Sequence, residues 1–213
     1  SLSGGETFLV SLGLALGLER NGVRVRFVCE PGSPVEPMAR DAGLEVHTVA
    51  IPRNQVRASA RRLAAFFDEH PVDLVNSQTR RDRSALTYAA LRYPRLPPLV
   101  VTWRGMSFTF PVKNWAQSMI ARRVIAVSPA VAESLVRRGT PRGRLVVVPN
   151  GLVVERVDRP VSEAEVEAWR ERIGWTPTQR TIGIVSRPKL HHVVLQALAH
   201  VRTPVRLVCA GVD

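Results

Sequence analysis

Short, almost unbroken aliphatic runs alternate with helical segments along nearly the whole chain of 213 residues. Residues 124–127 and 145–148 are the clearest runs, and their lack of polar alternation is typical of parallel strands covered on both faces. The alternation predicts an α/β fold built on a Rossmann-like, doubly wound parallel sheet. We expect strands at 23–29, 45–51, 74–76, 99–103, 124–127, 144–148, 181–186 and 205–210, and helices at 6–21, 34–42, 55–70, 81–91, 130–138, 163–173 and 191–200.

The last strands of the chain belong to a second domain. A polar turn at 176–179 follows an acidic helix, and a new strand opens directly after it. We therefore place a first Rossmann-like domain at residues 1–178 and the beginning of a second at residues 179–213. Two strands and one helix cannot enclose a core of their own, so we expect the sequence to be part of a longer chain.

Basic residues outnumber acidic ones. There are 30 Lys and Arg against 18 Asp and Glu, a formal net charge of +12, and all but Lys113 and Lys189 of these cations are arginine. Such an excess suits a polyanion or an anionic membrane surface, but a coding bias towards arginine would produce it as well. The 45% of hydrophobic and 23% of charged residues exclude a disordered chain.

The two cysteines and the absence of targeting patterns indicate a cytoplasmic setting. Cys29 and Cys209 lie inside apolar runs, where we expect reduced core residues. No run of about 18 apolar residues and no leader pattern is present in the sequence, so no membrane span is expected. No metal site is expected, because two cysteines provide no framework and the adjacent His191 and His192 diverge on a helix.

A glycine turn leads into the first helix. Gly4 and Gly5 stand just before the predicted helix, where the free backbone N–H groups of a helix start attract phosphate and glycines permit close approach. The turn matches neither the three-glycine dinucleotide motif nor a Walker sequence. A plain tight turn remains the alternative.

Polar and basic residues follow several predicted strands. Arg187 and Lys189 follow the strand at 181–186, where doubly wound sheets bind ligands, and the two cations suit a diphosphate. Two solvated surface cations are the alternative. Gln78, Arg104 and Asn150 also come just after predicted strands, where each could contact a ligand, cap a helix or form a turn.

In order along the chain, these segments resemble one family. The motifs are Gly4-Gly5-Glu6, Asp73-Leu74-Val75, Val124-Ile125-Ala126-Val127-Ser128, Val148-Pro149-Asn150-Gly151, Ile182-Gly183-Ile184-Val185-Ser186-Arg187 followed by a lysine, and Leu207-Val208-Cys209-Ala210-Gly211. The chain is similar to retaining glycosyltransferases of the GT-B fold, the "glycosyl transferases group 1" class. The resemblance covers essentially the whole sequence.

The resemblance implies two Rossmann-like domains that face each other across a cleft. The N-terminal domain would bind a cell-envelope lipid or polysaccharide acceptor, and the C-terminal domain would bind the nucleotide-diphosphate sugar. Arg187 and Lys189 would be the catalytic residues that hold the diphosphate, Gly4 and Gly5 would lie near the transferred sugar, and Gln78, Arg104 and Asn150 would contribute to donor or acceptor binding. No metal or cofactor is implied. The reaction would be a hexosyl transfer with retention.

The same resemblance, together with the net positive charge, suggests an anionic membrane surface as a partner. An arginine-rich helix with Arg57, Arg61 and Arg62 could dock on anionic lipid, which would make the protein peripheral at the inner face of the membrane. Nucleic acid is not an expected partner, because the chain lacks the aromatic platform on which bases stack.

The chain also departs from the family pattern. Gln78 and Arg104 stand where histidines are usual, Val153 stands for an aspartate, and Leu190 stands for a glycine. The family's paired glutamates would lie beyond Asp213, so the chain as given is expected to be inactive alone. The replacement of both histidines, by Gln78 and Arg104, motivates an alternative, a catalytically degenerate binding or scaffold protein on the same fold.

Overall fold

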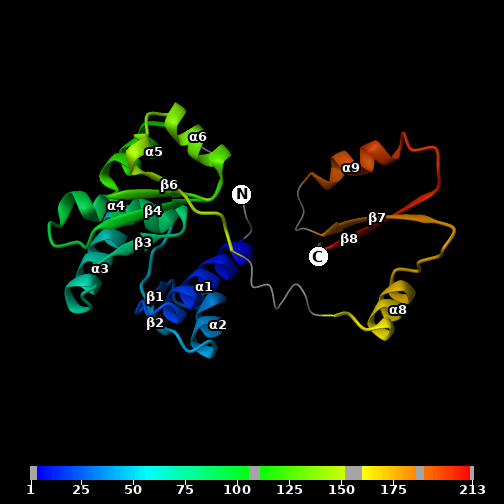
Figure 1. Ribbon diagram of the computed structural model, residues 1–213, viewed down its shortest axis with the longest axis horizontal. Coiled ribbons are helices and arrows are strands. Elements are labelled where there is room, and N and C mark those ends of the chain that lie inside the picture. The colour runs from blue at the N-terminus through cyan, green and yellow to red at the C-terminus, as the bar shows by residue number, and fades with distance from the viewer. Residues whose placement is uncertain (1–3, 106–110, 152–159, 186–189, 212–213) are drawn as a thin grey trace. The chain divides into compact units, whose positions relative to one another are not determined.

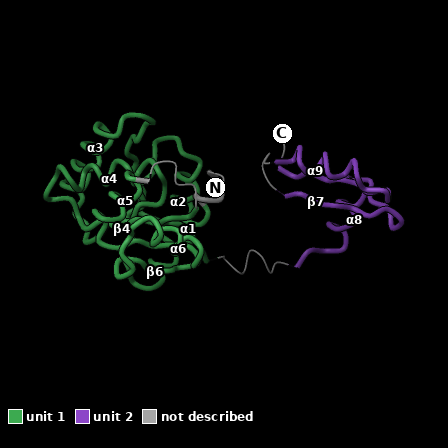
Figure 2. The backbone as a smooth tube through the Cα atoms, turned by 90° about the horizontal axis from the view of Figure 1, so that it is seen from above, with its two compact units in different colours: residues 1–153 green, residues 154–213 purple. Residues whose placement is uncertain are grey.

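The computed structural model describes residues 4–105, 111–151, 160–185 and 190–211. The chain divides into two compact units, residues 1–153 and residues 154–213, which are coloured separately in Figure 2. In chain order the elements are α1 (Gly4–Arg20), β1 (Arg26–Cys29), α2 (Val35–Asp41), β2 (Glu45–Thr48), α3 (Val56–Glu69), β3 (Val75–Ser77), α4 (Arg80–Arg92), β4 (Leu99–Trp103), α5 (Pro111–Ile120), β5 (Arg123–Ala126), α6 (Pro129–Arg137), η1 (Arg142–Arg144), β6 (Leu145–Val147), α8 (Glu163–Arg172), β7 (Arg180–Val185), α9 (His191–Leu198) and β8 (Val205–Ala210).

Every described strand pair is parallel, and helices alternate with strands (Figure 1). In the first unit β3, β4, β5 and β6 form one sheet in that order, and β1 pairs with β2 in a separate sheet. In the second unit β7 pairs with β8. The predicted α/β class with parallel, Rossmann-like sheets is confirmed.

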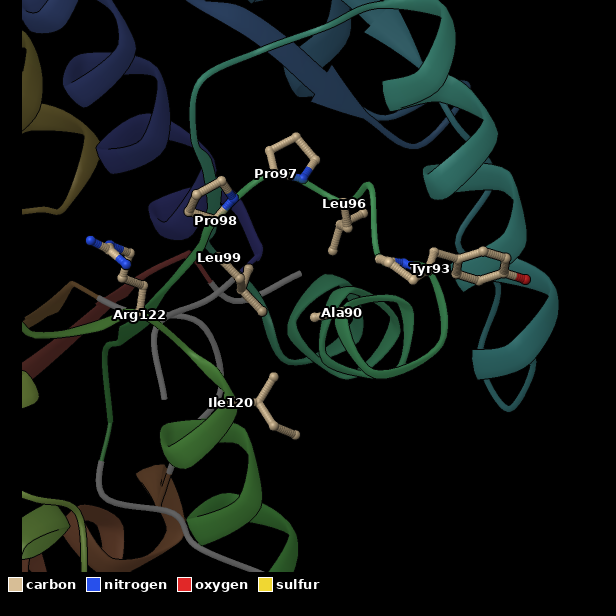
Figure 3. Close-up of a pocket in the computed structure, with 9 residues that line it drawn as sticks. Ala90, Tyr93, Leu96, Pro97, Pro98, Leu99, Ile120 and Arg122 are labelled. Carbon is tan, nitrogen blue, oxygen red and sulfur yellow. The ribbon is translucent and has the colours of Figure 1, made fainter.

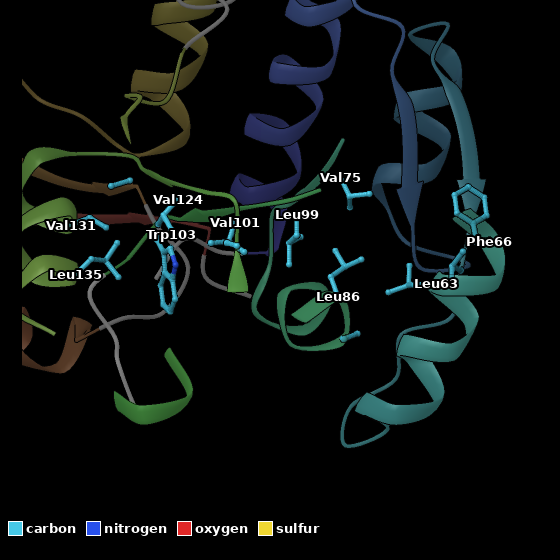
Figure 4. Close-up of a cluster of buried hydrophobic side chains, with 14 residues drawn as sticks. Leu63, Phe66, Val75, Leu86, Leu99, Val101, Trp103, Val124, Val131 and Leu135 are labelled. Carbon is cyan, nitrogen blue, oxygen red and sulfur yellow. The ribbon is translucent and has the colours of Figure 1, made fainter. Parts of the chain in front are cut away.

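The main hydrophobic core of the first unit surrounds β4, all five residues of which are buried. Leu99, Val101 and Trp103 come from this strand, while other strands and helices of the unit supply the remaining side chains (Figure 4). A strand buried along its whole length has helices on both faces, as the aliphatic run predicts. The carboxyl end of β4 is therefore held rigidly, which fixes the backbone of the residue that follows it.

Helix boundaries follow local capping chemistry. Ser128 caps α6, since its Oγ accepts a hydrogen bond from the backbone N–H of Val131 at 3.3 Å, and Pro129 occupies the first helical position. The same helix ends at Gly139, whose φ of +88° is left-handed. Its N–H donates to the carbonyl of Val136, and the N–H of Thr140 donates to that of Leu135, which is the Schellman pattern.

The second unit holds no buried residue among its described positions. The prediction that Cys209 is a core residue is therefore wrong: β7 and β8 are covered on too little of their surface, and Cys209 is exposed, whereas Cys29 is buried as expected. The run at 144–148 is also less covered than predicted, because β6 lies at the edge of its sheet and leaves Val146 and Val147 exposed.

Two further features differ from the sequence-based expectations. The division at 153/154 lies well before the expected boundary at 178/179, so α8 belongs to the second unit. Arg206 of β8 explains this, because its guanidinium donates to the carbonyls of Ile173 and Gly174 just after α8. In addition, α5 lies where no helix was expected; it begins at Pro111, a residue that suits the first turn of a helix.

Candidate functional site

Three of the predicted binding residues meet at the carboxyl ends of the strands of the first unit. Gln78 follows β3, Arg104 follows β4, and Asn150 lies beyond β6 in the same parallel sheet. Gly4 and Gly5 form the first turn of α1 itself rather than a loop that precedes it. Arg187 and Lys189 lie outside the described residues.

Arg104 joins these residues. Its Nη1 donates to Oδ1 of Asn150 at 3.2 Å, and its Nη2 donates to Oε1 of Gln78. Nη2 also approaches Oγ of Ser11, on α1, at 3.5 Å. The guanidinium thus connects the ends of two strands that lie on opposite sides of β4 with the first helix, and we call Arg104, Gln78, Asn150 and Ser11 the Arg104 cluster.

The Arg104 cluster contains a cation with neutral partners. Gln78, Asn150 and Ser11 all offer uncharged oxygens, and within the described part of the chain no carboxylate forms an ion pair with Arg104. Burial lowers the pKa of Arg104 below the ordinary value of an arginine, and the charge of Asp82 opposes that shift. An arginine remains protonated at neutral pH even so, so the cluster carries a full positive charge.

Asp82 fixes the backbone of Gln78. Thr79 and Asp82 form a capping box at the start of α4, in which Oδ1 of Asp82 accepts from the N–H of Thr79 at 2.8 Å. Oδ2 of Asp82 accepts from the N–H of Gln78 at 3.0 Å. Burial raises the pKa of Asp82, while these backbone hydrogen bonds oppose the shift. Because its oxygens are used in this way, Asp82 orients Gln78 without contacting Arg104.

A second arginine, Arg83, is buried and supports the end of β4. Nη1 of Arg83 donates to the carbonyl of Thr102 at 3.0 Å, and Nε donates to Oε1 of Gln117 at 3.2 Å. The guanidinium carbon lies 3.7 Å from the centre of the Trp103 ring, within the range of a cation–π contact. Burial lowers the pKa of Arg83 to about 10. These contacts hold the two residues that immediately precede Arg104.

A surface hollow of about 280 Å³ lies at the other end of β4 (Figure 3). Apolar side chains, one tyrosine and one arginine line it, and none of the predicted site residues does. Leu99, the first residue of β4, contributes to it, whereas Arg104 follows the last residue of that strand. The lining residues are Ala90, Tyr93, Pro94, Leu96, Pro97, Pro98, Leu99, Ile120 and Arg122. The hollow is therefore separate from the candidate site.

No group of three His, Cys, Asp or Glu side chains in the described ranges is arranged to hold a metal ion. The site instead presents a guanidinium, two amides and a hydroxyl. Groups of this kind bind hydroxyls, phosphates and carboxylates by hydrogen bonds.

Residues 3–156 match the sequence model described as Glycosyltransferase Family 4. The chain belongs to this family. Comparison with curated protein sequences gives no match.

Solved structures share the fold of this family 4 chain. Alr3699/HepE from Anabaena, in complex with UDP-glucose, superposes with a TM-score of 0.78 at 17% identity, over 98% of this chain and 57% of that one. A glycosyltransferase from Rickettsia africae ESF-5 gives 0.76 at 16%, over 98% and 57%. The lipopolysaccharide outer core galactosyltransferase WaaB gives 0.65 at 14%, over 100% and 58%. The predicted GT-B type is confirmed, and the chain spans less than three fifths of these structures.

Leu190 has a left-handed backbone. This residue, at whose position the resemblance predicts a glycine, has a φ of +53° and precedes the first turn of α9. Left-handed backbone disfavours a side chain with a β-carbon by about 1–2 kcal/mol, so the position retains a conformation that suits glycine.

Three residues of the site in this family 4 chain were not found from the sequence. Ser11 lies in the middle of an apolar helix, and neither Arg83 nor Gln117 stands next to a strand end. An arginine in a charged helix start is usually exposed, so the sequence carries no signal that Arg83 is buried. Thr79 and Asp82, in contrast, could be recognised from the sequence, because they have the spacing of a capping box.

Proposed function

We propose that the full protein transfers a sugar from a nucleotide-diphosphate sugar to a cell-envelope lipid or polysaccharide, with retention at the anomeric carbon. The observation that carries the proposal is the meeting of Gln78, Arg104 and Asn150 at the carboxyl ends of a parallel sheet in a family 4 chain. Doubly wound sheets bind their ligands at that edge. The UDP-glucose complex of Alr3699/HepE and the lipopolysaccharide substrate in the name of WaaB support the donor and acceptor classes.

The two parts of the chain take different roles in this proposal. The first unit, residues 1–153 rather than the expected 1–178, holds the acceptor, and residues 154–213 open the domain that holds the donor. Arg187 and Lys189 bind the donor diphosphate and stabilise the charge that develops as it departs, the largest contribution in many enzymes. Gly4 and Gly5 bring the N–H groups of α1 close to the sugar and its phosphate. Cations and helix ends offset the diphosphate charge, so the proposal includes neither a metal nor a cofactor.

A catalytically degenerate binding or scaffold protein is the second candidate. Gln78 and Arg104 replace histidines that are usual in the family, and an amide and a guanidinium do not exchange protons near neutral pH. Such a protein binds the nucleotide sugar without transferring it. The two candidates differ only in turnover, so an assay separates them.

We also propose a cytoplasmic, peripheral location at an anionic membrane surface, without a nucleic-acid partner. Arg57, Arg61 and Arg62 are exposed on α3, and the first two are one helical turn apart. In the described residues, no helix is long and apolar enough to cross a membrane. Co-sedimentation of the full protein with anionic and with neutral vesicles tests this location, and equal binding to both would count against it.

Product analysis with the full protein tests the main proposal. The protein is incubated with a panel of nucleotide-diphosphate sugars and an envelope glycan extract, and nucleotide release and labelled product are followed. A product whose new anomeric bond keeps the donor's configuration by NMR is expected. Donor binding without transfer or hydrolysis would instead support the second candidate.

The donor contacts are tested separately by substitution. Arg187→Ala is expected to weaken nucleotide-diphosphate binding by about 1.5–3 kcal/mol, the range for a hydrogen bond to a charged group. Arg202→Ala removes an exposed arginine of the same unit and serves as the matched control. Calorimetry that shows equal affinity for both variants would contradict the role of Arg187.

A further inference from the structure

We propose that the acceptor carries an anionic group and that Arg104 binds it. This inference rests on the proposed function and adds the substrate class. The oxyanion is a carboxylate or a phosphate on the sugar or lipid that receives the transferred residue. Arg104 is then a specificity-determining residue of the first unit rather than a member of the donor site.

Arg104 has N–H groups that no described residue accepts from. A guanidinium has five N–H groups, and the described residues provide three oxygens for them, from Gln78, Asn150 and Ser11. Nε is buried and has no hydrogen-bond partner in the described part of the chain. The second N–H of Nη1 is likewise unused there, beside a hydrogen bond to Asn150 that is exposed to solvent.

The charge of Arg104 is also not balanced by its neighbours. Desolvating a guanidinium costs free energy unless an opposite charge compensates, and the partners of Arg104 are neutral. Asp82 is the carboxylate that influences it electrostatically, but the oxygens of Asp82 accept from backbone groups of Gln78 and Thr79. A bound oxyanion would supply the missing charge and accept from the unused N–H of Nη1.

The surrounding sequence strengthens the positive potential. Residues 51–150, which include Arg104, contain 17 of the 30 Lys and Arg side chains but only five of the 18 acidic ones. Summed positive charge of this kind attracts anionic ligands and raises their local concentration. A purely structural role explains less, because a neutral amide could donate to the oxygens of Gln78 and Asn150 without placing a charge there.

The inference assigns the anion to the acceptor because Arg104 belongs to the unit expected to bind it. Gln78 and Asn150 place the guanidinium at the end of the sheet of the first unit. Arg187 and Lys189 already serve the donor diphosphate in the proposed function. The competing assignment, that Arg104 serves the diphosphate as well, predicts a different response to substitution and is one arm of the test.

The test measures binding of matched probes to the full-length protein by ligand-observed NMR. Methyl α-D-glucuronoside carries a carboxylate where methyl α-D-glucoside carries a hydroxymethyl group. Glucose 6-phosphate carries a phosphate at the same position and tests the phosphate alternative. Wild-type protein is expected to bind at least one anionic probe about tenfold more tightly than the neutral one, a ratio typical of a charged hydrogen bond. The probe that is preferred identifies the anion as carboxylate or phosphate.

Variants assign the preference to Arg104. Arg104→Gln keeps a hydrogen-bonding side chain without the charge and is expected to reduce the preference to twofold or less, while UDP affinity changes by less than twofold. Arg122→Gln removes a charge at the hollow near the start of β4 and is expected to keep the preference.

Three results would overturn the inference: no anion preference in the wild type, a preference that survives in Arg104→Gln, or a tenfold loss of UDP affinity in that variant. The last result would assign Arg104 to the donor diphosphate. Failure of the proposed function would give a different result, the absence of sugar transfer from every donor. The product analysis described above measures it separately.

Discussion

The guanidinium of Arg104 donates a hydrogen bond to the side-chain oxygen of Gln78 across the carboxyl ends of the neighbouring strands β4 and β3. The family resemblance predicts a histidine at each of these two positions, and in this chain an arginine and a glutamine form a bonded pair there instead. An arginine needs an acceptor where it is partly buried, and the amide of Gln78 provides one without cancelling the charge.

Gln78→Glu is expected to cancel that charge. The new carboxylate would form an ion pair with Arg104, so that binding of an anionic glycoside should weaken about tenfold, while the free energy of unfolding should change by no more than about 1 kcal/mol. NMR titration and urea denaturation measure the two effects. Gln196→Glu introduces the same charge on an exposed position of α9 and should leave the affinity unchanged. Equal affinities in wild type and Gln78→Glu would show that Arg104 does not contact the anion.

Arg83→Lys is expected to lower the free energy of unfolding by about 1.5–3 kcal/mol. A single ammonium group cannot bond both the Thr102 carbonyl and Gln117 while stacking on Trp103, as the planar guanidinium does. Urea denaturation measures the loss, with Arg92→Lys on the exposed side of the same helix as the control. If both variants are as stable as the wild type, the buried contacts of Arg83 contribute nothing to stability.

The stability at acid pH should depend on Glu45. Hydrogen bonds from His47, then Arg26 and Arg24, lower the pKa of Glu45 from 4.5 to about 2. A carboxylate with a lowered folded-state pKa stabilises the fold above its unfolded pKa, and this contribution disappears as the pH falls through the folded value. Wild-type protein should therefore lose stability relative to Glu45→Gln between about pH 4.5 and pH 2.

Urea midpoints over that pH range measure the effect at Glu45. Glu69→Gln removes an exposed carboxylate that forms no ion pair with a described residue, and it should keep the wild-type acid slope. Parallel curves for wild type and Glu45→Gln would exclude the bonds to Glu45 as a source of acid sensitivity.

Two glycines that end helices in the same way separate backbone strain from steric conflict. Gly139 has a φ of +88° and Gly43 a φ of +82°, and both donate within Schellman motifs. A β-carbon at Gly139 would lie 3.1 Å from Cδ1 of Trp115, whereas at Gly43 it would meet nothing within 4 Å. Gly43→Ala should cost about 1 kcal/mol for the left-handed backbone alone, and Gly139→Ala should cost more. Equal losses in thermal unfolding would mean that Trp115 moves aside freely.

The regular elements could be predicted from the sequence because local chemistry determines them. The aliphatic runs gave β4 and β8 with their observed bounds, and Ser128 with Pro129 gave the start of α6. The burial of each strand could not be predicted in this way. Cys209 and Val147 stand in runs as apolar as β4, yet they are exposed, because burial depends on which strand is central and which lies at an edge.

The position of the candidate site could be predicted from the sequence, but its side-chain contacts could not. Gln78, Arg104 and Asn150 could be named because each follows a strand, and parallel strands bring their carboxyl ends to one edge. Their direct bonds to one another were not predictable, since side-chain reach and rotamer are not encoded in spacing. Ser11 and Arg83 were missed for the same reason: both act through contacts with residues far along the chain.

The exchange of a histidine for Arg104 alters how the site responds to acidity. Imidazole gains and loses its proton between pH 5 and 8, whereas a guanidinium stays cationic throughout this interval. If Arg104 binds a carboxylate on the acceptor, both partners keep their charge from pH 5 to pH 8, and the preference should be the same at the two ends of that interval. A phosphate that loses its second proton near pH 6 would instead bind more tightly as the pH rises.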